Sequence, residues 1–274
     1  MTAITLTTPQ RLLGIDDLAA GDFAALLDLA AVMKRHPLAW RSTLEGRAVA
    51  CLFEHPATRG RVSLEVAVHR LGALPVVLAA VGGSLADTAR SLSSYCDAIA
   101  VHTDRHRDLL ELAEHASVPV INARTDRAHP CQALADCLTL RERYGALGGL
   151  EIAWVGAAEP VTHSLIEAAI RADFTIRLAA PPALRPDPAL LARAGGSIRV
   201  FDTPREAVSG AVAVYAATPR RELPDAYTVT PELLSFAAPG ALVLHATPTS
   251  EQAANLLPAE QAVLRALVGG DWEA

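Results

Sequence analysis

Lysine is nearly absent from this sequence: Lys34 is the single lysine among 24 basic residues, and aromatic side chains make up only 4% of the 274 positions. The formal net charge is −6, so the chain lacks the basic surplus that nucleic-acid-binding proteins normally carry, and no nucleic acid is expected as a partner. The many arginines remain available as planar, bidentate binders of anions.

Long apolar runs and CxxC pairs are also missing. No run approaches the roughly 18 consecutive apolar residues of a membrane-spanning helix, so we expect no membrane partner. The N-terminal stretch MTAITLTTPQRLLG lacks the charged-then-apolar layout of a secretory signal, which predicts a cytoplasmic protein. The four cysteines have no metal-ligand spacing and are expected to be free thiols: Cys51, Cys96, Cys131 and Cys137.

Apolar residues make up 51% of the chain, and a length prior of about 150 residues per domain suggests two domains. Short, β-branched segments alternate with segments of helical length. Strands are expected at 49–53, 97–103, 118–122, 151–156, 175–180, 197–202, 211–217 and 241–246. Helices are expected at 61–72, 84–95, 105–116, 132–146 and 162–172. This alternation predicts an α/β fold with parallel sheets covered by helices on both faces.

The strand count starts again after the Gly-rich turn in YGALGGLEIAWVG, which places a domain boundary near residue 148. We therefore expect two α/β domains of similar size. Ligands of such sheets bind beyond the carboxyl ends of the strands, at topological switch points. The sequence thus predicts a site between the two domains.

The stretch FEHPATRGRVSLEVAVHR contains the first candidate site. The expected strand stops at His55-Pro56, and a helix beginning near Arg59 would present free backbone N–H groups there. The Thr58 hydroxyl and the guanidinium groups of Arg59 and Arg61 add donors, which indicates a phosphate or carboxylate cradle. The alternative is a solvated helix start whose arginines form surface ion pairs.

A second candidate lies in VINARTDRAHPCQALADCLTL, where His129 and Gln132 stand between an expected strand and an expected helix. A histidine and an amide on such a turn can donate hydrogen bonds to a carbonyl oxygen in a cleft. Alone, His129 would be read as a structural histidine. Together with the Thr58–Arg61 segment in the same half of the chain, it favours a shared site.

These segments resemble the aspartate/ornithine carbamoyltransferase family, on its ornithine side. The family's Ser-Thr-Arg-Thr-Arg phosphate motif corresponds to residues 57–61, and its Asp-Thr-Ala helix start to residues 87–89. Its His-Pro-Cys-Gln motif is intact at residues 129–132, followed by the usual Ala-Leu-Ala-Asp at 133–136. The resemblance is specific from about residue 44 to 144 and continues more weakly to the end.

The resemblance implies two doubly wound parallel-sheet domains. Residues 1–147 would bind carbamoyl phosphate, residues 148–250 would bind the amine acceptor, and residues 251–274 would form a helix that returns to the first domain. Active sites of this family lie between the subunits of a homotrimer. In the reaction that the resemblance implies, a neutral amine would attack the carbamoyl carbon, a tetrahedral oxyanion would form and phosphate would leave, with no metal or organic cofactor.

The resemblance also assigns roles within the first domain. Thr58, Arg59 and His129 would hold the carbamoyl oxygen or the phosphate, and Gln132 the carbamoyl amino group. Arg61 would chiefly support the donor-binding loop. Positioning and charge stabilisation would be the protein's main contributions to the reaction.

Several donor-side positions depart from the family pattern. Ala57 and Gly60 replace two hydroxyl residues, which leaves the backbone amides of that loop as donors. His102 stands where the family has an arginine, and Leu256 replaces another arginine near the C-terminus. Leu78 falls nearest the glutamine that reaches the neighbouring subunit in ornithine enzymes. Each lost donor to an anion is worth roughly 1.5–3 kcal/mol, so weaker binding of carbamoyl phosphate is expected.

The acceptor side departs further. Where ornithine enzymes carry an aspartate and paired asparagines, this chain has residues 157–160, Ala-Ala-Glu-Pro, and the family's His-Cys-Leu-Pro has become His-Ala-Thr-Pro at 245–248. Glu159, His245 and Thr247 are the candidate acceptor-binding residues. Glu159 would recognise an amine or guanidine, or else lie exposed at the surface. Ornithine itself is not expected as the acceptor.

Two functional hypotheses follow. The first is an enzyme that carbamoylates an amine other than ornithine, in a specialised biosynthetic pathway; the second is a non-catalytic paralogue that binds or regulates. A Rossmann dehydrogenase is disfavoured because WVGAAEPVTHS lacks GxGxxG. HTDRHRD at 102–108 suits no zinc site, Cys131 has no base to activate it, and Trp154 is expected in the core.

Overall fold

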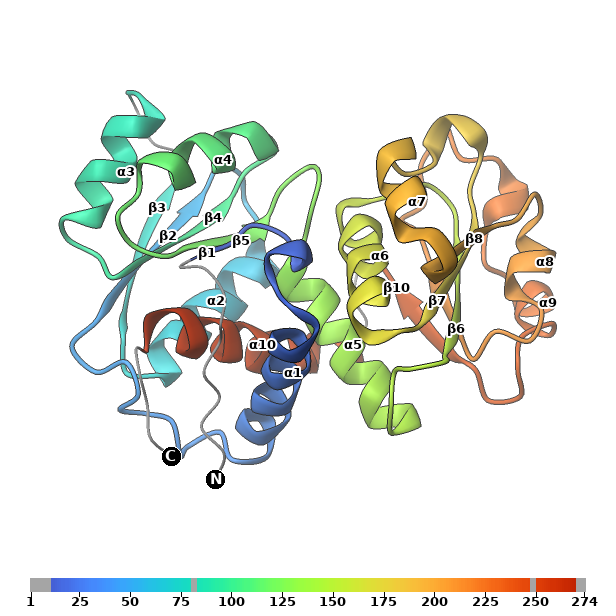
Figure 1. Cartoon of the computed structure of the whole chain (residues 1–274), viewed down its shortest axis with the longest axis horizontal. Helices are drawn as coiled ribbons and strands as arrows, with labels where there is room; N and C mark the ends of the chain where they lie inside the picture. Colours follow the sequence, from blue (N-terminus) through green and yellow to red (C-terminus); the bar gives the residue numbers. More distant parts are fainter. Residues whose placement is uncertain (1–10, 80–82, 247–249, 270–274) are drawn as a thin grey trace.

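The computed structural model describes residues 11–79, 83–246 and 250–269. Figure 1 shows two parallel sheets lying side by side, each covered by helices, which confirms the predicted two-domain α/β fold. The first sheet contains β1 (Arg11–Leu12), β2 (Ala48–Phe53), β3 (Leu74–Ala79), β4 (Ala98–His102) and β5 (Val120–Arg124). The second contains β6 (Glu151–Val155), β7 (Thr175–Ala179), β8 (Ile198–Val200), β9 (Ala213–Ala216) and β10 (Leu242–His245).

Strand order places one switch point in each sheet. The first sheet runs β1-β5-β4-β2-β3 and the second β10-β9-β6-β7-β8, and all neighbouring strands are parallel. In the first sheet, β3 pairs with one side of β2, and the next strand in sequence, β4, pairs with the other side. In the second sheet, β7 and β9 flank β6 in the same way. Crevices therefore open beyond β2 and β4, and beyond β6 and β9.

Ten α-helices are assigned within the described residues. They are α1 (Ala20–Arg35), α2 (Thr58–Arg70), α3 (Leu85–Ser93), α4 (His106–His115), α5 (Pro130–Tyr144), α6 (Pro160–Ala172), α7 (Pro188–Ala194), α8 (Pro204–Val208), α9 (Pro231–Leu234) and α10 (Ser250–Val268). The C-terminal α10 packs against α1, α2 and α5, so it lies with the first sheet although it follows the second in sequence (Figure 1).

The eight expected strands and five expected helices are confirmed, with ends shifted by up to three residues. The pattern misses β3, whose second residue is Pro75. An edge strand tolerates proline because the missing N–H need not serve a further strand. The pattern also misses α1, although its buried apolar face has helical spacing: Phe23, Leu26, Leu27, Ala30 and Met33.

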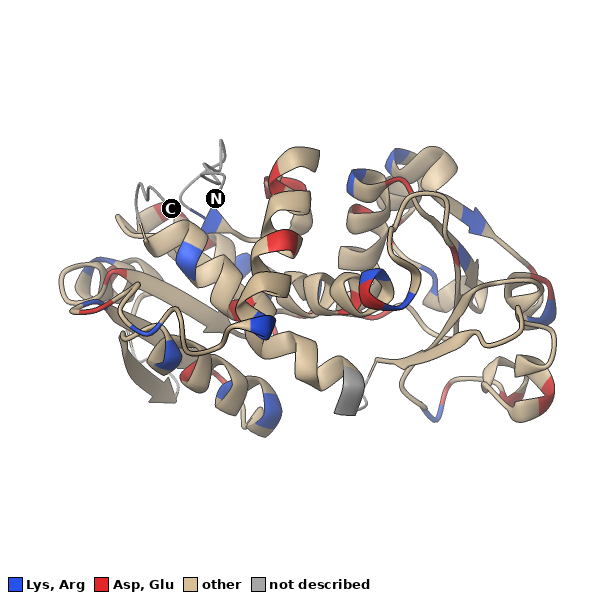
Figure 2. Ribbon diagram, turned by 90° about the horizontal axis from the view of Figure 1, so that it is seen from below, with Lys and Arg blue, Asp and Glu red and all other residues tan. Residues whose placement is uncertain are grey.

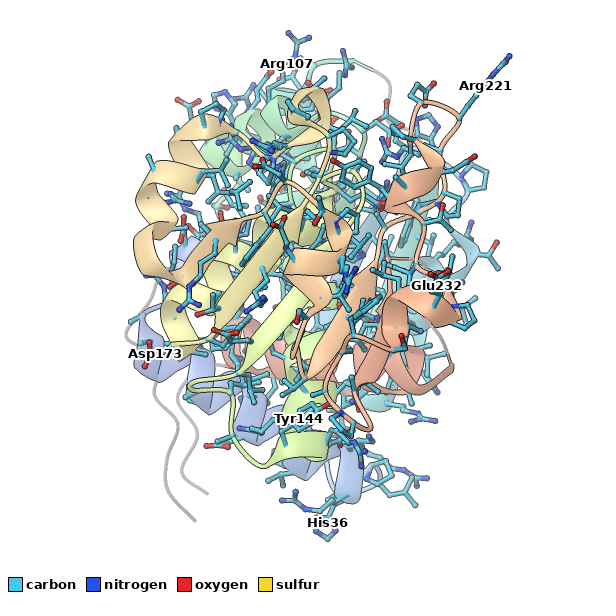
Figure 3. All side chains as sticks on the ribbon, turned by 90° about the vertical axis from the view of Figure 1, so that its right-hand side faces the viewer. His36, Arg107, Tyr144, Asp173, Arg221 and Glu232 are labelled. Carbon is cyan, nitrogen blue, oxygen red and sulfur yellow. The ribbon has the colours of Figure 1, made fainter. Side chains whose placement is uncertain are left out.

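The long helix α5 joins the two halves. Its last residue, Tyr144, donates its hydroxyl proton to the carbonyl of Val212 at 2.5 Å and accepts from the N–H of Leu242 at 3.2 Å. Figure 3 shows Tyr144 at the end of α5 below the strands of the second sheet. This contact fixes the end of α5 to the second sheet.

The expectations for Trp154 and the four cysteines are confirmed. Trp154 is 1% exposed, and all four cysteines are buried free thiols. Burial raises the pKa of the Cys131 thiol, which keeps it protonated and unreactive. Basic and acidic positions are interspersed along the ribbon (Figure 2). No helix among residues 11–79, 83–246 and 250–269 is long and apolar enough to cross a membrane.

Candidate active site

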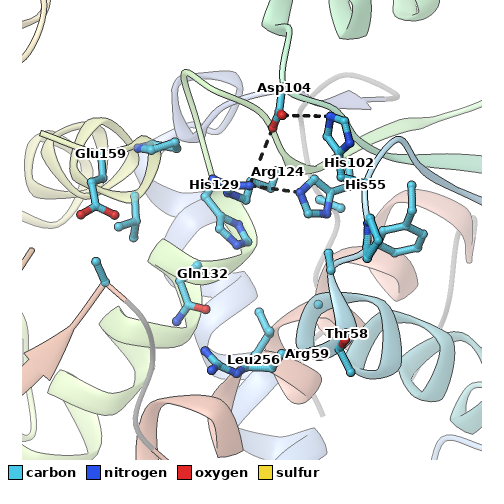
Figure 4. Close-up of a pocket in the computed structure, with 18 of the residues that line it drawn as sticks. His55, Thr58, Arg59, His102, Asp104, Arg124, His129, Gln132, Glu159 and Leu256 are labelled. Atoms are coloured by element: carbon cyan, nitrogen blue, oxygen red, sulfur yellow. Dashed lines mark hydrogen bonds and ion pairs between the residues drawn. The ribbon is translucent and has the colours of Figure 1, made fainter. Parts of the chain in front are cut away.

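A cleft of about 710 Å³ lies at the carboxyl ends of strands from both sheets (Figure 4). Its walls come from the loops that follow β2, β4 and β5 in the first half and β6 and β9 in the second. Polar residues of these loops that line it are His55, Thr58, Arg59, His102, Asp104, Arg124, His129, Gln132, Glu159 and Thr218. Both switch points therefore open into one cavity, where two halves of the chain can meet one ligand.

Helix α2 begins directly at this cleft. Ala57 is its N-cap residue and offers no side-chain cap, so the N–H groups of the first turn depend on a ligand or solvent. Thr58, Arg59 and Gly60 line the cavity. Among the described residues Arg59 forms no ion pair, whereas the Arg61 Nε donates to Glu65 at 2.7 Å. The structure thus brings Arg59 into the cleft and leaves Arg61 outside it.

His102 occupies the end of β4 and is only 7% exposed. Its Nε2 lies 3.2 Å from Nη1 of Arg124, and burial, followed by the Arg124 charge, lowers its pKa. A neutral His102 therefore accepts this hydrogen bond. Asp104 lies 3.0 Å from Nε2 of His55 and 4.0 Å from Nη1 of Arg124 (Figure 4).

Arg124 is a site residue that the sequence analysis missed. It ends β5 and lines the cleft beside His102, so a guanidinium group lies close to the position where the family places an arginine. The available signal was its place after an expected strand, at the same sheet edge as the other candidates. Its partner strand β4 could not be read from the sequence.

His129 forms the N-cap of α5, immediately before Pro130 at the first helical position. Its backbone N–H donates to Oγ of Ser164 on α6 at 3.0 Å, which ties the two halves together beside the cleft. Burial, with a smaller contribution from the Arg124 charge, lowers its pKa to about 3. The ring is therefore neutral at pH 7. Nδ1 is shielded from solvent and has no hydrogen-bond partner among the described residues.

Gln132 lies in the first turn of α5 and is 3% exposed. Its Nε2 donates to Oδ1 of Asp136 at 3.0 Å, and Asp136 also accepts from the Tyr215 hydroxyl at 2.7 Å and from Nε2 of Gln252 at 3.0 Å. Because an ionised carboxylate only accepts, this network fixes the amide nitrogen of Gln132 and leaves its oxygen to face the cleft (Figure 4).

Glu159 lies buried rather than at the surface, which corrects the alternative of an exposed side chain. It is 9% exposed and lines the cleft. Its carboxylate accepts from the backbone N–H of Thr218 at 2.6 Å and from the Thr218 hydroxyl at 3.1 Å. Gly156, at a φ of 114°, lets this loop approach, since an added Cβ would lie 2.6 Å from that of Ala217. The β6 and β9 loops thus form one unit.

Of the other two acceptor-side candidates, only His245 lies in the part of the chain that the structure describes. His245, at the end of β10, donates its backbone N–H to Oε1 of Gln252 at 2.9 Å and does not line the cavity, where its neighbour Ala246 does. Thr247 lies outside the described residues. Across the described ranges, no group of three or more His, Cys, Asp or Glu side chains is arranged to hold a metal ion.

Two parallel-sheet halves that share one cleft at their switch points define a two-domain α/β protein with an interdomain cleft. Models of the aspartate/ornithine carbamoyltransferase family match almost the whole chain: the carbamoyl-P binding domain at residues 10–142 and the Asp/Orn binding domain at residues 148–264. The chain belongs to this family, whose members are transferases.

Comparisons with individual proteins support the same family. The chain is 41% identical to the ornithine carbamoyltransferase of Acidothermus cellulolyticus, over 93% of this chain and 90% of that protein. It is 37% identical to that of Methanocorpusculum labreanum, over 92% and 96%. Among solved structures, the ornithine carbamoyltransferase from Thermus thermophilus matches with a TM-score of 0.90 at 37% identity, over 96% of this chain and 100% of that one. The enzyme from Pyrococcus furiosus matches with a TM-score of 0.92 at 32% identity, over 97% and 99%.

Proposed function

We propose that the chain transfers a carbamoyl group from carbamoyl phosphate, or a related donor, to an amine acceptor other than ornithine. The observation that carries this proposal is the contrast between the two sides of the cleft. Thr58, Arg59, His129 and Gln132 line it from the first half of the chain, the donor end, whereas the carboxylate of Glu159 lines it from the second half, the acceptor end. In this proposal residues 1–147 hold the donor and residues 148–250 the acceptor.

The donor end suits a phosphate with an attached carbonyl group. The uncapped start of α2 and the Arg59 guanidinium supply donors to the anion. The neutral His129 ring can donate one N–H to the carbamoyl oxygen, and this bond strengthens as negative charge develops on that oxygen. The oxygen of Gln132 can accept from the carbamoyl amino group. A neutral amine then attacks the carbamoyl carbon, the new C–N bond replaces the C–O bond to phosphate, and the departing phosphate takes up the proton that the nitrogen loses.

The acceptor end disfavours the binding of an amino acid. Ornithine carries a carboxylate, and a second carboxylate, Glu159, already lines this part of the cleft with both oxygens held by Thr218. Like charges in a partly buried cleft repel each other. The same carboxylate attracts a cationic or hydroxyl-bearing group, so an amine without a carboxylate is favoured.

The alternative is a non-catalytic family member that uses the cleft only for binding or regulation. Leu256 supports it, because this buried apolar side chain lines the donor end where the family has an arginine. The polar groups of His129 and Gln132 favour the enzyme hypothesis, because a non-catalytic scaffold does not require a neutral imidazole and an oriented amide at a cleft. A homotrimer and a cytoplasmic location remain predictions.

The acceptor preference is tested with ornithine and 1,4-diaminobutane, which differ only by the carboxylate. With radiolabelled carbamoyl phosphate, we expect transfer to 1,4-diaminobutane to exceed transfer to ornithine at least about tenfold, which corresponds to roughly 1.4 kcal/mol. Glu159→Gln should narrow this ratio, whereas Glu232→Gln, an exposed control, should keep it. A wild-type protein that prefers ornithine contradicts the proposed acceptor class, and transfer to no amine supports the scaffold.

A further inference from the structure

Glu260 is a buried acid that faces the donor end of the cleft and has no role in the function proposed above. It lies on α10, is 4% exposed and lines the cavity. The Ser63 hydroxyl donates to its Oε2 at 2.5 Å. Ser63 lies one helical turn after Arg59 on α2, so Glu260 faces the side of α2 that carries Arg59.

The surroundings of Glu260 keep its carboxyl group neutral. Burial raises its pKa to about 8, and the Ser63 hydrogen bond opposes this shift only in part. Neighbouring titratable groups are the thiols of Cys51 on β2 and Cys131 on α5, whose pKa values are themselves raised by burial. Among the described residues Glu260 forms no ion pair with a cation. At pH 7 the group therefore carries its proton.

The charges around this end of the cleft indicate which ligand such a group would meet. The start of α2 and the Arg59 guanidinium give a positive potential there, which attracts anions and repels cations such as protonated amines. From α10, only Leu256 and Glu260 among the described residues line the cleft, and Leu256 has no polar atom to offer. A protonated carboxyl group donates one hydrogen bond, so Glu260 can bind an anion oxygen without repelling it.

We propose that Glu260 binds the donor as a neutral carboxylic acid, by donating a hydrogen bond to an oxygen of the phosphate group that Arg59 and the start of α2 hold. This inference rests on the proposed function, because it requires an anionic donor at this end of the cleft. It makes Glu260 a replacement, on the same helix face as Leu256, for an anion donor that an arginine supplies elsewhere in the family.

The test uses sulfate, because its charge stays constant between pH 7 and pH 9. Calorimetric titration of the wild type should show affinity falling about tenfold between these pH values, as the protonated fraction of a group with a pKa of about 8 falls. Glu260→Gln stays neutral and keeps a donor, so its affinity should match the wild type at pH 7 within about threefold and stay constant to pH 9. Glu111→Gln, an exposed control on α4, should retain the wild-type pH dependence.

A second variant, Ser63→Ala, should shift the pH at which sulfate affinity falls, whereas Glu260→Gln should abolish the pH dependence. Ser63→Ala deletes the hydrogen bond that lowers the Glu260 pKa, so the loss of affinity should shift to higher pH. Arg59-dependent sulfate binding with the same pH profile in wild type and Glu260→Gln would overturn the inference and leave the proposed function intact. Absence of Arg59-dependent binding at every pH would overturn both.

Discussion

Trp154→Ala is expected to lower the free energy of unfolding by about 3–5 kcal/mol, the usual cost of truncating a fully buried tryptophan. Trp154 stacks on Tyr215 with ring centroids 4.5 Å apart, and its Nε1–H donates to the carbonyl of Ala157 at 3.1 Å. Alanine loses both contacts and leaves a cavity. Because Ala157 begins the loop that carries Glu159, the acceptor end of the cleft should loosen as well.

Urea unfolding followed by far-ultraviolet circular dichroism measures this loss without relying on tryptophan fluorescence. Trp154→Phe is the matched control, because it retains an aromatic ring against Tyr215 and loses the hydrogen bond, which is worth about 1 kcal/mol. Trp154→Phe should lower the free energy of unfolding by well under half as much as Trp154→Ala. A cost below about 1 kcal/mol for alanine would show that Trp154 does not organise the second sheet.

The second large effect is a pH dependence of stability that Asp136 causes. Burial raises its pKa from 3.8 to about 6, although three hydrogen bonds from Gln252, Tyr215 and Gln132 oppose the shift. Since the folded pKa lies above the unfolded one, the folded chain takes up this proton first as the pH falls. Wild-type stability should therefore gain about 2.4 kcal/mol between pH 7 and pH 4 relative to Asp136→Asn, which does not titrate.

Other groups titrate over the same range in both proteins and cancel in the difference. Urea unfolding at pH 4, 5, 6 and 7 gives that difference directly. Asp225→Asn, an exposed control, should run parallel to the wild type. A difference between wild type and Asp136→Asn that stays constant with pH would contradict a buried, ionised Asp136 that orients Gln132.

The sequence predicts the parts of this fold whose signals are local. Buried strands such as β6 and β9 are short apolar runs, and the helix start at Thr58 follows from a strand that ends at His55-Pro56. The edge strand β3 is not predicted from the sequence because its residues are half-exposed and include a proline. Its burial is decided by its neighbours and not by its own pattern.

The candidate site shows the same division. Thr58, Arg59, His129 and Gln132 are predicted as one site because both segments follow expected strands in the same half of the chain, and all four line the cleft. Which side of α2 faces the cavity depends on tertiary packing, so the residue pattern alone does not separate Arg61 from Arg59; only the resemblance to the family assigns them different roles.

Long-range partners set the remaining features. Arg124 beside His102, Thr218 around Glu159 and Ser63 beside Glu260 join segments 22, 59 and 197 residues apart. No periodicity or spacing in the sequence encodes such pairs. The protonation state of Glu260 likewise follows from burial that only the packed α10 creates.

The central claim is that this cleft binds a carbamoyl donor through Arg59, and calorimetric titration with carbamoyl phosphate at low salt tests it most directly. We expect Arg59→Ala to bind about ten- to a hundredfold more weakly than the wild type, since a hydrogen-bonded charge is worth roughly 1.5–3 kcal/mol. Inorganic phosphate should compete, and Arg70→Ala, which removes an equal charge from the far end of α2, should bind like the wild type. Wild-type protein that does not bind carbamoyl phosphate, or binding that is unchanged in Arg59→Ala, would contradict the account.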